Sequence, residues 1–97
     1  MTGYATFAEE AISVGSSATK LTANNLYASP PPSRVEIQVR GAQIRYRLDG
    51  TDPTSGVGKL ANPFDYITLT QRNDMTNFSA IQVSAAATLW VSWERER

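Results

Sequence analysis

Residues 44–54 read IRYRLDGTDPT, and this stretch decides the fold class. Ile44, Tyr46 and Leu48 recur at every second position, as on a strand with one buried face, and arginines occupy the positions between them. The Asp-Gly and Asp-Pro pairs that follow are turn formers, so they end the strand. The pattern indicates a small β domain. It contains no nucleophile beside a base, no metal-ligand cluster and no phosphate-binding loop.

The stretch before this strand alternates in the same way. Residues 34–40 carry an apolar side chain at every second position, which predicts a strand with its apolar face turned inward. Gly41 and Ala42 follow as a short turn signal. We therefore predict that residues 34–40 and residues 44–48 form a hairpin.

The rest of the chain is a series of short apolar runs separated by turn-like segments. Three runs are predicted strands: residues 66–70, 78–84 and 88–93. Residues 49–63 are rich in Gly, Pro, Asp, Thr and Ser, which predicts a long surface loop. Residues 71–77 are predicted to form a polar turn, residues 94–97 a charged tail, and residues 7–11 carry a weak signal for a short helix.

A proline-rich run, SPPPS at residues 29–33, separates two parts of the sequence that differ in composition. Proline has no amide donor and cannot continue a ladder of strand hydrogen bonds. Residues 1–33 are small and polar and are predicted to form a partly extended arm that docks on another subunit. Residues 34–97 are predicted to form the core of an all-β fold, a small antiparallel β-sandwich that is immunoglobulin-like or jelly-roll-like.

Length and composition limit how such a chain is stabilised. With 97 residues, 41% of them hydrophobic, it makes one domain that buries about 60 to 70% of its unfolded surface. It has no cysteine and no histidine, so neither disulfides nor a histidine zinc site can staple it. Contact with other subunits is the remaining source of additional stability, and we expect a homo-oligomer. Its nine basic and nine acidic residues cancel, which favours neither nucleic acid nor a membrane as partner.

The beginning of the sequence bears on where the chain folds. Residues 1–6 (MTGYAT) have neither the basic start nor the apolar run of a signal peptide. No stretch approaches the roughly 20 apolar residues that span a bilayer. We expect folding in a reducing cytoplasm, and a virion protein assembled inside a host cell meets the same conditions.

The stretch at residues 44–54 resembles the I-x-Y-x-x-D-G-(S/T)-D-P-(T/S) hairpin of the immunoglobulin-like C-terminal domains of chitobiases and other bacterial carbohydrate enzymes. The likeness continues weakly through residues 66–69 and 78–83, where that family has its next strands. This resemblance implies an immunoglobulin-like sandwich. It also implies a carbohydrate-binding module as an alternative function.

The whole arrangement is similar to small bacteriophage virion proteins. It combines a short N-terminal segment, RYRLDGTDPT at residues 45–54, NFSAIQV at residues 77–83 and a final LWVSW strand at residues 89–93. Proteins of this type are encoded among head and tail genes, and the better-understood ones are decoration (cement) proteins or accessory structural subunits. The resemblance implies a place in the virion, with the major capsid protein or other virion subunits as partners.

Aspartates in the turns are the first candidates for a chemical site. Asp49, Asp52, Asp65 and Asp74 offer the carboxylate oxygens that calcium prefers. However, Asp-Gly and Asp-Pro are ordinary turn formers, and the spacing is not that of a twelve-residue calcium loop. A glycosidase use of Asp49 and Asp52 needs one raised pKa in an enclosed cleft, which a solvent-facing turn does not provide. We predict structural turns, no catalytic residue, no metal and no cofactor.

Arginines and aromatic side chains are the candidates for an interface. Arg45 and Arg47 share a face that Tyr46 does not, so the ring cannot interleave with them against nucleic acid bases. We interpret the two arginines as solvated or interface-facing. Tyr4 and Tyr27 are further candidates, because interfaces are enriched in Tyr, Trp and Arg.

The two tryptophans are three positions apart on the last predicted strand, so they point to opposite faces. Trp93 is predicted to join the core, and Trp90 to face outward. An outward tryptophan can stack on a sugar ring or anchor a protein interface.

These observations together predict a non-enzymatic structural protein of a phage particle. The preferred role is a capsid decoration or cement protein that stabilises the shell through protein contacts. The alternatives are a tail or head-to-tail accessory protein and a carbohydrate-binding module.

Overall fold

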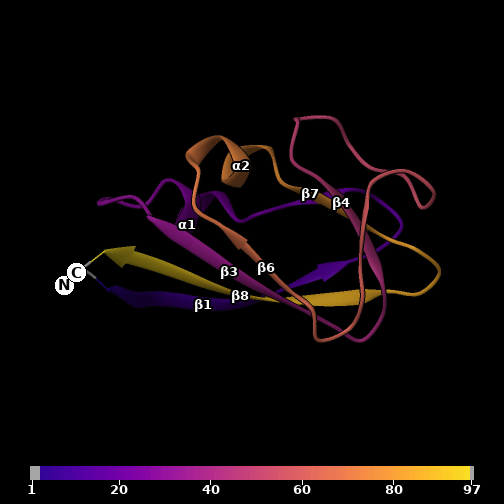
Figure 1. Cartoon of the computed structure of the whole chain (residues 1–97), viewed down its shortest axis with the longest axis horizontal. Helices are drawn as coiled ribbons and strands as arrows, with labels where there is room; N and C mark the ends of the chain where they lie inside the picture. Colours follow the sequence, from indigo (N-terminus) through magenta and orange to yellow (C-terminus); the bar gives the residue numbers. More distant parts are fainter. Residues whose placement is uncertain (1–2, 97) are drawn as a thin grey trace.

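Two antiparallel four-stranded sheets pack face to face in a computed structural model that describes residues 3–96 (Figure 1). The first sheet contains, in spatial order, β1 (Tyr4–Val14), β8 (Ala87–Glu96), β3 (Arg34–Arg40) and β6 (Tyr66–Leu69). The second contains β2 (Thr19–Lys20), β7 (Ser79–Gln82), β4 (Ile44–Arg47) and β5 (Lys59–Ala61). Two short helices complete the chain, α1 (Ala23–Leu26) and α2 (Arg72–Asn77). The prediction of a small antiparallel β-sandwich is confirmed.

Alternation of apolar residues places the core between the sheets, as predicted. Opposed positions on β3 and β8 pair Ile37 with Val91 and Val35 with Trp93, and all four side chains are fully buried. The second sheet contributes Ile44 and other side chains to the same cluster. Burying one large apolar side chain stabilises the fold by about 1.5–3 kcal/mol.

The predicted hairpin of residues 34–40 and 44–48 is wrong. β3 pairs with β8 and β6 in the first sheet, whereas β4 pairs with β7 and β5 in the second. The turn at Gly41, whose φ of 89° suits glycine, therefore carries the chain across the sandwich. Alternation determines which face of a strand is buried, but it does not determine the partner strand. Two consecutive strands with inward apolar faces can pair in one hairpin or lie in opposite sheets across the core.

The prediction that residues 1–33 form an arm outside the core is also wrong for the described part of that segment. β1 pairs with β8 from Tyr4 opposite Glu96 to Val14 opposite Ala87, with one irregularity between Thr6 and Ala8. The predicted short helix at residues 7–11 lies within this strand. Small and polar residues suit β1, because one of its faces is open to solvent and one of its edges has no partner strand.

An acidic side chain ties the N-terminal part of the chain to the sandwich. Glu10 on β1 accepts hydrogen bonds from Thr22 Oγ1 (2.6 Å), Asn25 Nδ2 (2.6 Å) and Trp93 Nε1 (2.7 Å). Leu26, on the same short helix as Asn25, is buried in the core. Helix α1 therefore covers the inner face of the first sheet beside Trp93.

The remaining predicted segments are partly correct. Strands β6, β7 and β8 lie within the predicted runs or overlap them. The predicted loop at 49–63 contains β5, and the predicted polar turn at 71–77 contains α2. The predicted charged tail continues β8 as far as Glu96. Residues 1, 2 and 97, at the ends of the predicted arm and tail, lie outside the described residues.

Helices in the described part of the chain are all too short to cross a membrane. The start of β1 and the end of β8 lie side by side at one end of the molecule (Figure 1).

Candidate protein-interaction surface

Five side chains form a continuous row across the outer face of the first sheet. They come from all four of its strands: Glu9, Trp90, Arg40, Gln38 and Tyr66. The register explains the row, because Trp90 lies opposite Gln38, and Gln38 lies opposite Tyr66. Side chains at opposed positions point to the same face of a sheet. We call these five side chains the outer row.

Direct contacts link each member of the outer row to the next. Trp90 Nε1 donates to Glu9 Oε1 at 2.8 Å, and the Arg40 guanidinium lies 5.3 Å from the centre of the Trp90 ring. Arg40 Nε donates to Gln38 Oε1 at 2.7 Å, and Gln38 Nε2 donates to the Tyr66 hydroxyl at 3.2 Å. A surface held by such contacts loses less side-chain entropy when a partner binds it.

Exposure in the outer row suits contact with a partner. Tyr66 is 63% exposed, Glu9 and Arg40 are exposed, and Trp90 is half-buried between its neighbours. Trp93 is fully buried on the opposite face of β8. The prediction that the two tryptophans face opposite ways is confirmed.

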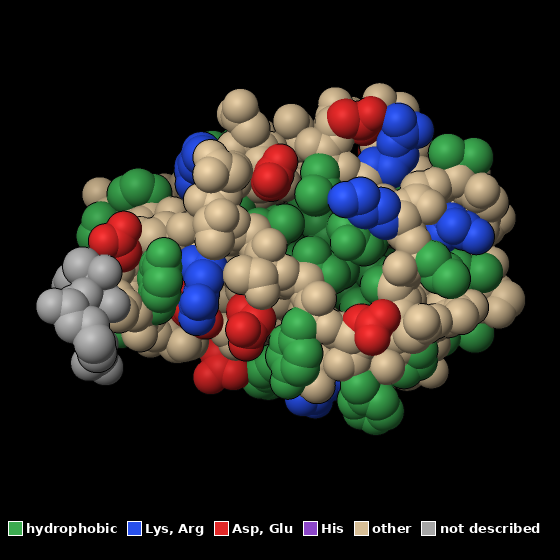
Figure 2. Space-filling model, in the orientation of Figure 1, with side chains coloured by type: hydrophobic (Ala, Val, Ile, Leu, Met, Phe, Trp, Pro, Cys, Tyr) green, Lys and Arg blue, Asp and Glu red, His purple; other side chains and the backbone are tan. Residues whose placement is uncertain are grey.

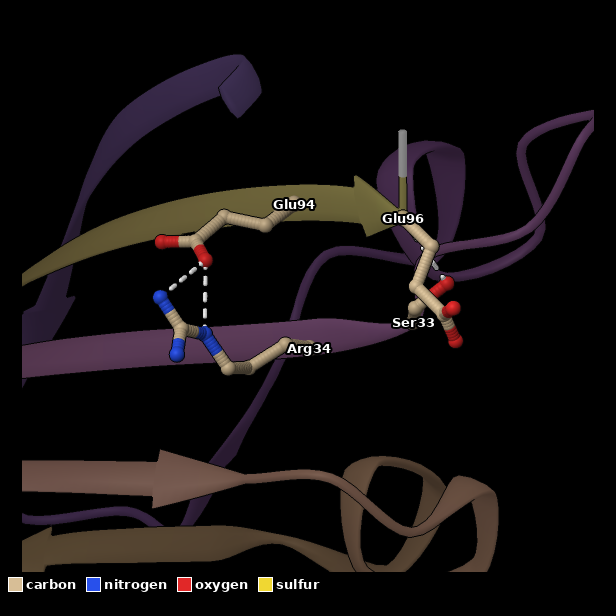
Figure 3. A network of polar contacts seen from close by, with 4 residues as sticks. All are labelled: Ser33, Arg34, Glu94 and Glu96. Atoms are coloured by element: carbon tan, nitrogen blue, oxygen red, sulfur yellow. Dashed lines mark hydrogen bonds and ion pairs between the residues drawn. The ribbon is translucent and has the colours of Figure 1, made fainter. Parts of the chain in front are cut away.

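A second group of contacts lies at the end of the same outer face. Arg34 donates from Nε and Nη2 to Oε1 of Glu94, each at 2.6 Å, and its guanidinium lies 4.3 Å from the centre of the Tyr4 ring. Figure 3 shows both bonds reaching one carboxylate oxygen, and beside them the backbone N–H of Glu96 donating to Ser33 Oγ at 3.3 Å. Tyr4, a predicted interface residue, is thereby fixed on the face that carries the outer row.

Arg45 and Arg47 lie on the second sheet, away from the outer row. Arg45 donates to the carbonyl oxygens of Ser55 (3.0 Å) and Gly58 (3.1 Å), so it ties down the loop after β4. Arg47 pairs with Asp49 at 2.7 Å. Both arginines bond to groups of their own chain, and they lie on the other sheet from Trp90.

Tyr27, the last of the predicted interface residues, follows α1. Its ring is 64% exposed, and the Arg72 guanidinium lies 5.2 Å from the ring centre. Arg72 Nη1 also donates to the carbonyl oxygen of Leu26 at 2.6 Å. Tyr27 is therefore an exposed aromatic outside the outer row.

Two turn aspartates, Asp49 and Asp65, accept from backbone N–H groups of their own turns, as predicted, whereas Asp52 bonds to a distant side chain. Asp49 accepts from Arg47 and, at 3.0 Å, from the N–H of Thr51, and these bonds hold the pKa of Asp49 below its ordinary value. Asp52 accepts from the Ser79 hydroxyl at 3.0 Å. Asp65 accepts from a turn N–H at 2.8 Å. Across residues 3–96, no three acidic side chains gather in a group that could hold a metal ion.

Sequence reasoning found Trp90 but missed its companions. Gln38, Arg40 and Tyr66 stand at outward positions of alternating runs, which the sequence does show, whereas Glu9 lies in a segment without such alternation. Their meeting depends on the register between strands, which local alternation does not contain.

Comparison of the chain with family models, with curated proteins and with solved structures finds no match. The likenesses to the chitobiase-type domain and to phage virion proteins therefore stay predictions.

Proposed function

We propose that this chain is a non-enzymatic structural protein of a phage particle, a decoration or cement protein of the head. It binds neighbouring shell subunits through the outer row. The observation that carries the proposal is the outer row itself, in which side chains from four strands are locked together and still present Tyr66 and Trp90 to a partner. The choice of a phage particle rests on the likeness of residues 45–54, 77–83 and 89–93 to small virion proteins.

A cement protein acts by the surface that it buries. A partner that binds only the closed shell stabilises that shell by mass action, because opening it must first break the contact. Trp, Tyr and Arg are the residues that most often dominate such interfaces. Trp90, Tyr66 and Arg40 supply all three types within one row.

The polar members of the outer row set the chemistry of the partner. Glu9 and Arg40 flank Trp90 with opposite charges, so a matching surface offers a cation and an anion on either side of an apolar site. Complementary charges of this kind favour correct orientation more than raw affinity. The major capsid protein is the proposed partner.

Binding to shells that lack the protein tests this proposal. Purified chain is added to such shells, and the fraction that sediments with them is measured for the wild type and for Trp90→Ala. Loss of a central aromatic anchor costs about 2 kcal/mol or more, which is about a 30-fold loss of affinity. Tyr27→Ala is the matched control, because it removes an exposed aromatic outside the outer row. Binding to isolated tails instead of shells would place the protein in the tail, the alternative virion position.

Carbohydrate binding is a second candidate, favoured by one specific observation. The half-buried Trp90 ring is bordered by Glu9, Arg40 and Gln38, which are hydrogen-bonding groups beside an aromatic platform. Sugars are held by stacking on such a ring together with polar contacts at its border. The same Trp90→Ala variant separates the two functions.

A further inference from the structure

Phe64 occupies a strained and exposed position in the turn between β5 and β6. The turn spans residues 62–65, and the N–H of Asp65 donates to the carbonyl oxygen of Asn62 at 3.0 Å. Pro63 precedes Phe64, whose φ is 72°, which makes a type II turn with phenylalanine where glycine is preferred. The ring is 72% exposed. A strained residue that presents an apolar ring to water points to a function of that ring.

Exposed apolar side chains are frequent in the stretch of sequence that contains this turn. Six large hydrophobic side chains of residues 3–96 are exposed, and four of them fall within ten consecutive positions: Val57, Leu60, Phe64 and Tyr66. β5 and β6 are edge strands of the two sheets, and the four-residue turn joins them, so both edges lie on one side of the sandwich. Exposed apolar side chains at such an edge are available to pack on another chain.

A cavity of about 410 Å³ opens at the start of β5, the short strand that leads into this turn. Its lining comes from β4, from the residues that follow β4 and from the start of β5: Tyr46, Arg47, Leu48, Asp49, Gly58 and Lys59. Lys59 at the cavity pairs with Tyr46 on β4, and β5 then runs from Lys59 to Ala61, directly before the turn that begins at Asn62. Figure 2 shows a hollow with hydrophobic side chains on its floor at the centre of this face. The exposure of Phe64 shows that it does not fill a cavity of its own molecule.

We propose that Phe64 enters this cavity on a second copy of the chain, and that the second copy returns the same contact. The two copies then form a two-fold symmetric dimer through the side that carries β5 and β6. A two-fold interface uses the same surface on both subunits, so it needs a protruding group and its receptor side by side on one molecule. Phe64 and the cavity satisfy that condition.

Charge and size favour a second copy as the occupant. Asp65 is exposed next to Phe64, and Lys59 is exposed at the cavity and has no ion pair within residues 3–96. Insertion of Phe64 brings Asp65 of one copy toward Lys59 of the other. The cavity is a hollow open to the surface, and its volume of about 410 Å³ leaves room for one aromatic ring. This dimer does not depend on a role in a phage particle.

Sedimentation velocity over a series of protein concentrations tests the dimer. We expect the wild type to dimerise and Phe64→Gly to weaken the dimer by about 30-fold, as for the loss of an anchor residue. The same variant should unfold at equal or higher temperature than the wild-type monomer, because glycine relieves the positive φ. Tyr27→Ala is the control and should dimerise like the wild type. These opposite effects on association and folding distinguish a docking ring from a structural one.

Charge exchange between two variants gives a second, independent test. Lys59→Glu alone places like charges together at both contacts of the dimer, and so does Asp65→Lys alone. When the two variants are mixed, each contact regains one cation and one anion. We expect each variant alone to dimerise weakly and the mixture to form a heterodimer.

Several outcomes would overturn the proposal. One is a wild-type chain that stays monomeric up to near-millimolar concentration, and another is a Phe64→Gly variant that associates as the wild type does. A monomeric wild type that loses binding to shells on Phe64→Gly would assign the turn to a different protein partner and reject the second copy. Failure of the variant mixture to form a heterodimer would reject the two-fold arrangement.

Discussion

Arg34 on β3 and Glu94 on β8 form an ion pair of 2.6 Å on the outer face of the first sheet, and Glu94 is only 6% exposed. The Arg34 guanidinium also lies against the Tyr4 ring on β1, so one arginine connects three neighbouring strands. A carboxylate this deeply buried depends on its partner, because an unpaired buried charge strongly destabilises the folded state.

Replacing one member of this pair should destabilise the protein more than replacing both. Arg34→Ala is expected to lower the free energy of unfolding by about 2 kcal/mol, since it leaves Glu94 buried without a cation. The double change Arg34→Met with Glu94→Leu should recover most of that loss. Urea unfolding measures both. Arg47→Ala is the control, because its partner Asp49 lies at the surface, and it should leave stability almost unchanged. A double variant that is less stable than Arg34→Ala would contradict this account.

Deleting residues 1–11 should unfold the domain. The deletion removes most of β1, which exposes the edge of β8, and it removes Glu10, the acceptor for Trp93 Nε1. A buried indole N–H without a partner adds about 1–3 kcal/mol to the lost packing. Loss of a cooperative thermal transition in circular dichroism is the expected result. Deletion of residues 1–3, which precede β1, should retain the transition. A truncated chain that melts at the wild-type temperature would show that β1 contributes little to the core.

Tyr46 should make the protein less stable at high pH. Its side chain stacks on Phe78, and burial together with the Asp65 carboxylate raises its pKa in the folded state. The unfolded chain releases this proton near pH 10, whereas the folded chain retains it. Stability is therefore unaffected below about pH 10 and falls as the pH rises from there toward the folded-state value.

Tyr46→Phe should remove that part of the alkaline loss. Urea unfolding at pH 8 and at about pH 11 gives the difference for the wild type and for the variant. The variant should lose less stability between the two pH values, while Tyr27→Phe, a change at an exposed ring, should behave as the wild type does. Equal losses in wild type and Tyr46→Phe would contradict the role assigned to Tyr46.

Glycan binding by Trp90 separates the two candidate functions. If the protein is a cement protein, a glycan array should show no specific binding by the wild type or by Trp90→Ala, and the variant should lose occupancy on shells. Specific glycan binding by the wild type that Trp90→Ala abolishes, together with no binding of the wild type to shells, would reject the cement role. That result would favour the carbohydrate-binding module.

Local pattern was enough to assign faces and turns in this chain. The inward positions of Val35, Ile37 and Trp93 follow from period-two alternation, which depends only on neighbouring residues. The turn role of Asp49 follows in the same way, because its acceptor bonds reach only Arg47 and Thr51, two positions to either side.

Strand partners and the candidate surface needed contacts between distant parts of the chain. Arg34 and Glu94 are 60 positions apart, and Glu9 and Trp90 are 81 apart. Nothing within either segment specifies the other. The same limit explains why the segment that forms β1 looked like an arm: its polar character describes its exposed face, and only the packed sandwich shows that Glu10 reaches Trp93. Alternation is a local property of a strand, whereas pairing and register follow from the collective packing of both sheets.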